Sequence, residues 1–597
     1  MKKNGSIRER SEIPEEMRWD LQRMYEDEDV WEKELDSVRN RIGEITDLKG
    51  TLKDTKSIAR IIRLTDEISR ILERVYTYSH LRHDEDLRNR RYQELHDRAV
   101  NMVVKLETAG SYIIPEILEL PKKKLNDLLK EDELRFAEVP LKEIIRKKEH
   151  FLSKREERLL AMADEALETP SKAFKMLNDA DLKFPTIKDQ EGNEVELSHG
   201  RYISFMTSDN REVRMNAFKA LYSVYDEHKN TFASLIEGEL KKRMFRARAR
   251  KYSSSLEASL DSDEVTEDVY NSLIEAVRKH LPSMYDYLDL RKRVLDLDQV
   301  HFYDVYAPLV KDFDRKIPYE EAWDMVIAAM EPLGDEVASI LKKARDNRWI
   351  DVSENRGKRS GAYSSGCYDS SPYIMMNYEG KVNDVFTLAH ELGHSVHTYL
   401  ANENQPHITA DYRIFVAEVA STVNENLLLR HLSDIWTSND ERIYLTNHHL
   451  DSFKGTVFRQ TMFSEFEKEI ASLVENDKPL TAEGLSEIYG KLNEDHFGPR
   501  TFHDNEIDLE WARIPHFYYN FYVYKYATGF SAATAISKGI VEGKLDLDDY
   551  MGMLKKGGSE PPLELLRGAG VDLSTPAPID EGLKLFDSLV ENLNRLI

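Results

Sequence analysis

Apolar residues recur at spacings of three and four along most of this chain of 597 residues. This spacing builds one apolar stripe on a helix, because an α-helix turns once every 3.6 residues. One such stripe consists of Ile58, Ile61, Leu64, Ile68, Ile71 and Val75. Similar stripes run through residues 90–120, 205–250, 265–295 and 440–475. Because glycine (26) and proline (19) are scarce, the sequence predicts a mainly α-helical fold with long helices and few turns.

Two short regions interrupt the helical pattern. Residues 184–199 hold a Gly-Asn turn at 192–193 between extended segments, which predicts a small hairpin at the end of an N-terminal helical part. Residues 357–379 are rich in Gly, Ser and Tyr. We expect short strands at Ala362-Tyr363 and at 372–378, and therefore a small β-sheet beside the helix that follows.

The composition excludes several classes of protein. With 84 Lys+Arg against 109 Asp+Glu, the net charge is −25, which argues against a nucleic-acid binder. The sequence has neither a membrane-spanning apolar stretch nor the apolar core of a secretory signal peptide. A single cysteine rules out an intrachain disulfide framework and a metal site built from cysteines. We therefore expect a cytoplasmic protein that binds neither nucleic acid nor a membrane.

An HExxH motif lies in residues 390–394, on a segment with a helical apolar stripe. On a helix, His390 and His394 lie one turn apart on the same face, so both imidazoles can reach one zinc ion. Glu391 projects beside them and is the candidate general base that acts on a water. The motif predicts a zinc hydrolase site with the two histidines as ligands.

A third ligand is needed, and one known pattern fails. That pattern has a histidine six residues after the second motif histidine and a glycine halfway, but these positions hold Leu400 and His397. His397 shares the helix face with His390 and His394, yet three such residues span about 10 Å of helix. This is too long for one ion with zinc–nitrogen bonds of about 2.1 Å. We expect His397 to have a packing or supporting role.

The other pattern supplies a glutamate from a later helix. Residues 411–430 offer Glu418 and Glu425, which are seven apart and therefore on nearly the same face. Glu418 has apolar neighbours, where a carboxylate is costly unless it binds a metal or pairs with Arg or Lys. We predict Glu418 as the third metal ligand. Either Glu425 or Asp384 could accept the free N–H of a ligating histidine, and the sequence leaves that choice open.

Several segments together resemble one peptidase family. They read GKRSGAYSSG, TLAHELGH, DYRIFVAEVAST and PHFYYNFYVYKYATG, with further matches at IPEEMRWDL, FPTIKDQEGNEVELSHGRY and GGSEPPLELLRGAGVD. The chain is similar over almost its whole length to oligoendopeptidase F. That is the bacterial branch of the thimet-oligopeptidase-like (M3) zinc peptidases.

The resemblance implies a fold and an organisation. The fold would be the mainly α, two-lobed, zincin-type architecture around a deep channel. Residues 1–200 would form an N-terminal helical domain, and residues 201–597 the catalytic M3 peptidase domain. The substrates would be oligopeptides cut at internal bonds, since the channel would exclude folded proteins.

The resemblance also implies roles for single residues. One zinc ion per chain would be held by His390, His394 and Glu418, with Glu391 as general base. The family places a histidine and tyrosines from the segment 515–529 opposite the zinc, where they stabilise the oxyanion.

Residues 515–526 supply the candidates for that second role. Pro515 suits a helix start, and a helix from there would place His516, Tyr519, Tyr522 or Val523, and Tyr526 on one face. So many hydrogen-bond donors make a purely aromatic core stripe less favoured, because each buried hydroxyl needs a partner. His516 and Tyr519 fit the family pattern best, with Tyr526 next.

A strand at 361–366 could bind substrate. An edge strand beside a zinc site can pair with an extended peptide backbone without reading its side chains. Gly361, Ala362 and Tyr363 are the candidate substrate-binding residues, and Gly361 and Gly366 would allow close approach. Cys367 is expected to be a small buried residue without a catalytic role.

Two other functions share most of these features. A C-terminal exopeptidase would use the same zinc chemistry with a fixed cation for the terminal carboxylate. Arg356, Arg359 and Arg513 lie near the motifs and could supply it. A non-catalytic peptide binder is disfavoured, because both the ligands and the base are present.

Overall fold

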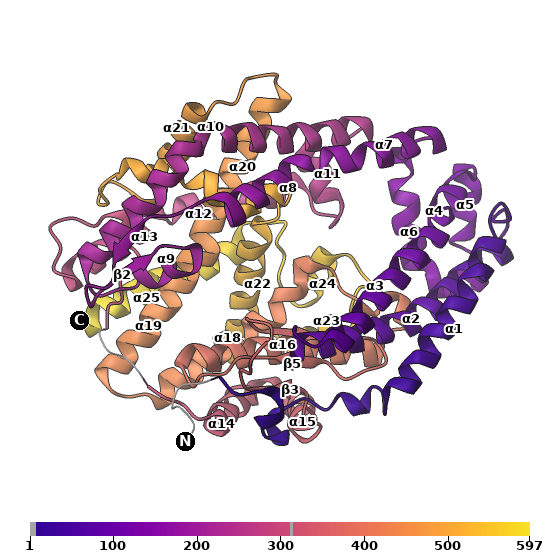
Figure 1. Ribbon diagram of the computed structural model, residues 1–597, viewed down its shortest axis with the longest axis horizontal. Coiled ribbons are helices and arrows are strands. Elements are labelled where there is room, and N and C mark those ends of the chain that lie inside the picture. The colour runs from indigo at the N-terminus through magenta and orange to yellow at the C-terminus, as the bar shows by residue number, and fades with distance from the viewer. Residues whose placement is uncertain (1–6, 311–314) are drawn as a thin grey trace. The chain divides into compact units, whose positions relative to one another are not determined.

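The computed structural model describes residues 7–310 and 315–597 of the chain (Figure 1). This described part is mainly α-helical, as the sequence predicts, and its few strands are short. The chain divides into two compact units, each assembled from three segments. The first unit comprises Met1–Phe151, Asp314–His431 and Ile536–Gly570, and the second comprises Leu152–Phe313, Leu432–Ala535 and Val571–Ile597. The division into sequence modules 1–200 and 201–597 stays a prediction.

The first unit is built from helices and one small sheet. Its helices are α1 (Glu28–Asp47), α2 (Thr55–Glu85), α3 (Arg90–Gly110), α4 (Ile113–Leu118), α5 (Lys122–Leu128), α6 (Glu138–Arg146), α14 (Tyr319–Ala329), α15 (Gly334–Asp346), α16 (Val382–Asn404), α17 (His407–Ala410), most of α18 (Ile414–Ile435), α23 (Leu547–Lys555) and α24 (Pro562–Gly568).

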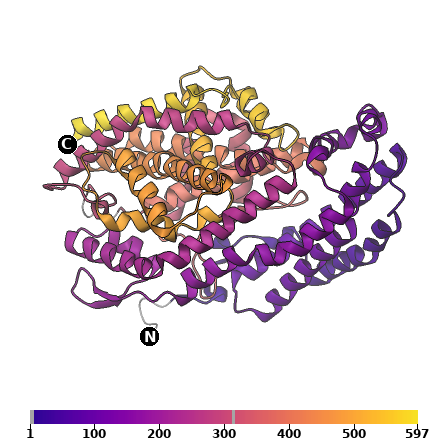
Figure 2. The same cartoon turned by 90° about the horizontal axis from the view of Figure 1, so that it is seen from above.

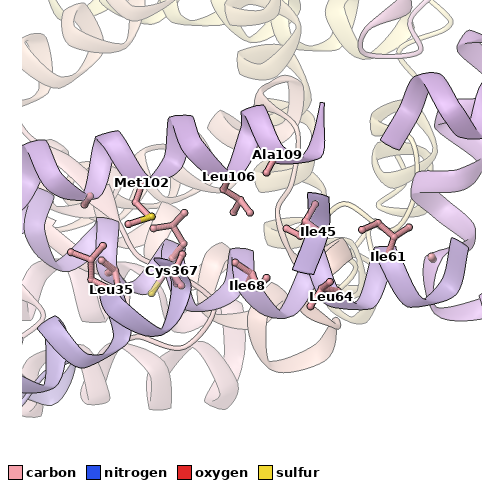
Figure 3. Packing of buried hydrophobic residues seen from close by; sticks show 14 of the residues in the cluster. Leu35, Ile45, Ile61, Leu64, Ile68, Met102, Leu106, Ala109 and Cys367 are labelled. Carbon is pink, nitrogen blue, oxygen red and sulfur yellow. The ribbon is translucent and has the colours of Figure 1, made fainter. Parts of the chain in front are cut away.

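Helices α1, α2 and α3 lie side by side in both views (Figures 1 and 2). Two of them begin at aspartate caps: Asp27 accepts from the Val30 N–H at the start of α1, and Asp54 accepts from Ser57 at the start of α2. Their apolar stripes are buried against one another, and each large apolar side chain contributes about 1.5–3 kcal/mol. Cys367 is buried in the same cluster (Figure 3). Its expected role as a small packing residue is confirmed.

A three-stranded sheet precedes α16, where the sequence predicts short strands. It has the order β3-β5-β4, made of β3 (Ile350–Asp351), β4 (Tyr363–Ser365) and β5 (Tyr373–Met375). Among the described residues, strand β4 pairs only with β5, antiparallel, and is therefore an edge strand, as expected. Because β4 begins at Tyr363, Gly361 and Ala362 precede the strand.

The second unit contains the longest helix of the described chain, α10, and the predicted hairpin. Strands β1 (Thr186–Lys188) and β2 (Glu194–Glu196) pair antiparallel around the Gly-Asn turn, which confirms the hairpin. Figure 1 shows α19 beside α25, a contact between segments far apart in sequence. The helices of this unit are α7 (Lys154–Leu167), α8 (Thr169–Met176), α9 (His199–Met206), α10 (Arg211–Ala249), α11 (Ser255–Asp261), α12 (Glu267–Lys279), α13 (Leu281–Val294), α19 (Asn439–Phe453), α20 (Arg459–Glu475), α21 (Ala482–Phe497), α25 (Ala577–Leu596) and most of α22 (Tyr524–Val541).

Among the described residues, no helix has the length and apolarity needed to cross a membrane.

Candidate metal centre and aromatic cluster

Helix α16 presents the two motif histidines to one point. Its apolar stripe Val385, Leu388, Leu392 and Val396 is buried, as the sequence predicts, and this fixes which face carries the histidines. The Nε2 atoms of His390 and His394 lie 3.2 Å apart, with ring planes at 82° to one another. Both imidazoles therefore offer a nitrogen to the same small volume.

Glu418 on α18 completes a triangle of donor atoms. Its Oε2 lies 3.3 Å from Nε2 of His390 and 3.4 Å from Nε2 of His394. Around a tetrahedral ion with bonds of about 2.0–2.1 Å, two ligand atoms are about 3.3 Å apart. The three donors therefore fit one zinc-sized ion. Within residues 7–310 and 315–597, these three form the one cluster of His, Cys, Asp and Glu with this property.

A glycine lets the two helices approach each other closely. A Cβ on Gly393, in the middle of the motif, would lie 2.5 Å from Cα of Ser421 and 2.7 Å from the carbonyl oxygen of Ala420, both on α18. The side chain of Asn424 donates to the carbonyl of Ala389 at 3.0 Å and joins the same two helices. This contact of backbones brings Glu418 to the histidines.

Glu425 and Asp384, the two alternatives for supporting a ligand, occupy different places. Glu425, two turns after Glu418 on α18, accepts a short hydrogen bond from Nδ1 of His390. This bond leaves the Nε2 lone pair of His390 free for a metal. Asp384 instead accepts from the backbone N–H groups of Glu379 and Lys381 at 2.8 and 2.9 Å, at the start of α16.

The charges at this site favour a cation. Burial opposes protonation of His390, but hydrogen bonds to Glu418 and Glu425 outweigh it and raise the pKa of His390 to about 10. Burial alone would raise the pKa of Glu418, yet the hydrogen bonds from both histidines hold that pKa well below its usual range. The two carboxylates thus create a place where positive charge is stabilised, whether on a proton or on a metal ion.

Glu391 is buried beside the histidines, on the side of the sheet. Burial raises the pKa of its carboxyl group, while the neighbouring histidines lower it. A backbone hydrogen bond from Ser364 in β4 also favours the ionised form. The side chain of Ser364 shares a 2.9 Å hydrogen bond with Ser395 of α16, which ties the edge strand to the motif helix.

His397 packs away from the donor triangle. It is buried, and its ring stacks on Tyr412 with centroids 3.6 Å apart and planes at 7°. The expected packing role is therefore confirmed.

Of the three candidate substrate-binding residues, Tyr363 begins the edge strand, and Gly361 and Ala362 directly precede it. Gly361 is exposed and has a φ of +89°, and its carbonyl accepts from the side chain of Asn377 at 2.9 Å. The hydroxyl of Tyr363 donates to the buried Asp84 at 2.8 Å. Ala362 lies between them and is half-buried.

In the second unit, the segment 515–526 is not the single helix that the sequence predicts. A short 3₁₀ helix, η11 (Pro515–Tyr518), ends before Tyr519, and α22 begins only at Tyr524. Between them Asn520 and Phe521 both adopt left-handed backbone conformations, with φ of 53° and 55°. Two such residues in succession end a right-handed helix. The prediction of one continuous helix was therefore wrong.

The turn nevertheless gathers the predicted donors into an aromatic cluster, made of His516, Tyr519, Tyr522 and Tyr526. The centroid of the His516 ring lies 5.6 Å from that of Tyr519, 6.5 Å from that of Tyr522 and 6.0 Å from that of Tyr526. Burial lowers the pKa of His516, and Arg459 adds to this, so the imidazole is neutral at pH 7.

Two sequence models of known protein families match this chain. A sequence model described as peptidase family M3 matches residues 204–585, and a second, described as oligopeptidase F, matches residues 116–184. The first match alone covers more than half of the chain. The chain belongs to peptidase family M3.

Relatives place this M3 chain with the oligoendopeptidase F group. It is 46% identical to oligopeptidase PepF of Bacillus subtilis over 100% of this chain and 89% of that protein. It is 40% identical to an oligoendopeptidase F homologue of Lactococcus lactis over 98% of both. The resemblance seen in the sequence is therefore confirmed, and the chain is a metallopeptidase.

Solved structures confirm the M3 fold. A peptidase from Chlamydophila abortus matches with a TM-score of 0.93 and 36% identity, over 99% of this chain and 100% of that one. Oligoendopeptidase F from Enterococcus faecium matches with a TM-score of 0.74 and 37% identity, over 95% and 99%.

Sequence reasoning missed the residues that hold the turn of this M3 chain in place. Arg243 on α10 donates to the carbonyl of Phe517 at 2.6 Å and pairs with Glu467 on α20 at 3.2 Å. Glu467, fully buried, also accepts from the N–H of Phe521 at 3.1 Å. Ser259 donates to the carbonyl of Asn520 at 2.7 Å.

A signal for Glu467 was present in the sequence. It directly follows Phe466 and lies one turn before Ile470 on an apolar helical stripe, the same kind of setting that pointed to Glu418. Tyr522, which was predicted on the same face but ranked below Tyr519 and Tyr526, also joins the aromatic cluster, because its ring centroid lies 5.2 Å from that of Tyr526.

Proposed function

We propose that this metallopeptidase is a zinc-dependent endopeptidase that hydrolyses internal bonds of oligopeptides. The observation that carries the proposal is the triangle of donor atoms from His390, His394 and Glu418, with Glu391 beside it. The names of the relatives, oligopeptidase PepF and oligoendopeptidase F, support oligopeptides as the substrate class.

His390, His394 and Glu418 would hold one zinc ion per chain. When bound, zinc would supply Lewis-acid chemistry, which lowers the pKa of a water and polarises a carbonyl. Glu425 would keep Nδ1 of His390 protonated and its ring oriented. Asp384 would act less directly, because its carboxylate fixes the backbone at the first turn of α16.

Glu391 would move the proton. Its carboxylate would accept a proton from the attacking water and deliver it to the leaving amine. The partly opposed effects of burial and of the histidines on its pKa suit a group that must both accept and release a proton.

His516, Tyr519 and Tyr526 would donate hydrogen bonds to the oxyanion that develops on the scissile carbonyl. Their clustering within the second unit, together with Tyr522, supports a shared role. A neutral His516 can donate one N–H, and each tyrosine one O–H.

The edge of β4 would bind the substrate backbone. Strand β4 pairs with β5 on one side, and the Ser364 N–H reaches Glu391. A peptide whose backbone paired with Gly361, Ala362 and Tyr363 would therefore lie beside Glu391, and this pairing would not depend on the identity of its side chains.

We also infer that folded proteins are excluded as substrates, that the protein acts in the cytoplasm, and that residues 201–597 form the catalytic module.

A C-terminal exopeptidase is not favoured. Two of the three arginines that could hold a terminal carboxylate already have acidic partners: Arg356 pairs with Glu9 at 3.5 Å, and Arg359 pairs with Asp84 at 3.3 Å. The third, Arg513, lines a cavity whose walls include none of the proposed catalytic residues, so it does not supply a cation at the proposed peptidase site.

The test combines a substrate and a variant. A quenched fluorescent peptide blocked at both ends should be cut internally by the zinc-loaded enzyme, with the products identified by mass spectrometry. Cleavage of peptides with a free C-terminus only would instead establish the exopeptidase. Glu391→Gln should lower kcat at least about 100-fold while metal analysis still finds one zinc per chain. Wild-type turnover by this variant would refute the role of Glu391.

A further inference from the structure

The second unit contains a cavity of about 280 Å³ that the proposed peptidase chemistry does not use. Its walls are mainly aromatic and aliphatic, and include Phe218 of α10, Phe302 and Phe497 of α21. Arg459, Glu510 and Arg513 also line it. The cavity therefore combines apolar walls with one charged group of residues.

That group carries an excess of positive charge. Nη2 of Arg459 and Nη2 of Arg513 donate to the same oxygen of Glu510, at 2.7 and 2.9 Å. The other oxygen of Glu510 accepts from the hydroxyl of Tyr489 at 2.7 Å. Two guanidinium groups thus share one carboxylate, in a chain whose net charge is −25.

The arginines also retain unused donors. A guanidinium has five N–H groups. Besides the bonds to Glu510, Arg513 donates from Nε to the hydroxyl of Tyr222 at 3.3 Å. Among the described residues, no side chain or carbonyl accepts from Nη1 of Arg459 or Arg513.

The site is largely buried and fixed in geometry. The side chains of Arg459, Arg513 and Glu510 are 14%, 23% and 3% exposed. Charged donors held away from bulk water bind an anion more strongly than the same groups at a surface. The apolar walls would accept the uncharged remainder of such a ligand.

We propose that this cavity binds a small monocarboxylate whose remainder is aromatic or branched aliphatic, with the carboxylate on Arg459 and Arg513. One negative charge matches the excess of one positive charge. Ligand pockets usually measure about 300–1,000 Å³, and this cavity of about 280 Å³ lies just below that range, so it fits a ligand the size of one or two amino-acid residues at most. A peptide's apolar C-terminal residue has this chemistry. The walls of the cavity include none of the proposed catalytic residues.

The test measures binding by isothermal titration calorimetry on the zinc-loaded enzyme. The probe is N-acetyl-phenylalanine, and the matched control is N-acetyl-phenylalaninamide, which has the same shape without the charge. We expect the acid to bind at least tenfold more tightly than the amide. Equal binding of the two, or no binding of the acid at millimolar concentrations, overturns the proposal.

Two kinds of variant test whether the acid binds in this cavity. Arg459→Gln should weaken binding of the acid at least tenfold, but it could also disturb the fold. Ile203 lines the same cavity and is 68% exposed, so it tolerates polar substitution. Ile203→Asp should weaken binding of the acid severalfold relative to Ile203→Asn, because only the first adds a repelling charge. Unchanged binding in Ile203→Asp contradicts this location.

A final control separates this inference from the proposed peptidase mechanism. Glu418→Ala should bind the acid as tightly as the wild type, although it should lack zinc and turnover. Loss of binding in Glu418→Ala would assign the acid to the metal site and overturn the cavity as its location.

Discussion

The candidate metal centre of the first unit and the aromatic cluster of the second unit are built in opposite ways. The metal centre rests on two regular helices, and its histidines are one turn apart on α16. The aromatic cluster rests on a turn with two left-handed residues, Asn520 and Phe521, between η11 and α22. The first therefore follows largely from helix geometry, whereas the second depends on contacts with residues 54 to 274 positions away in the sequence.

The two regions also differ in how their geometry is stabilised. At the metal centre, Gly393 removes a steric obstacle and the helix backbones pack directly. In the turn, a left-handed conformation costs roughly 1–2 kcal/mol for an ordinary residue. Arg243, Glu467 and Ser259 offset this cost by binding the backbone of residues 517–521. The packed helices thus require a small residue at their contact, whereas the irregular turn requires side chains that bind its backbone.

The largest expected effect concerns the metal centre itself. Glu418→Ala should remove one of three ligands, so zinc content and peptidase activity should both be lost. Zinc can be measured by mass spectrometry of the purified protein, with Glu379→Ala, at an exposed position just before α16, as the control. A Glu418→Ala protein that keeps one zinc per chain would show that the third ligand lies elsewhere.

The next effect tests the turn. Glu467→Gln leaves Arg243 buried with one charged partner fewer, and breaking a buried pair costs about 3–5 kcal/mol. We expect a lower melting temperature and a kcat reduced at least tenfold, with KM and zinc content unchanged. A variant that loses stability but keeps kcat per folded molecule would show that the turn does not position catalytic donors.

A smaller effect should appear at the helix contact. Gly393→Ala puts a Cβ against the backbone of α18, and overpacking of this kind costs about 1–3 kcal/mol. Zinc affinity should fall as well, because Glu418 moves with α18. The matched control is Gly43→Ala in α1, where a Cβ meets nothing within 4 Å and a helical alanine is favoured. Equal melting temperatures for the two variants would contradict the close contact.

The smallest effect concerns the backbone of the turn alone. Asn520 is exposed, so its substitution changes few contacts. Asn520→Ala should lower the free energy of unfolding by about 1 kcal/mol, because alanine tolerates the left-handed region less well than asparagine. Asn520→Gly should not, since glycine adopts that region freely. Chemical denaturation measures both, and an equal loss in both variants would place the effect in the lost side chain.

Much of the fold and of the metal centre could be predicted from the sequence, for a common reason. The helical stripes, the hairpin around Gly192 and the pair His390 and His394 all depend on residues close together in the chain. Glu418 could be predicted because a carboxylate among apolar neighbours requires a partner. The continuous helix predicted from Pro515 was wrong, because its local pattern is overridden by Arg243 and Glu467.

The sequence by itself determined the helical class, the family and the residue types that can hold a metal. Helix periodicity and motif spacing depend on residues that are close together in the sequence, so both can be recognised without the structure. Only the tertiary structure decided that Glu425 rather than Asp384 contacts His390, that Gly393 admits α18, and that Arg459 and Arg513 share Glu510. These contacts depend on which distant segments pack together, and the residue types alone do not specify that.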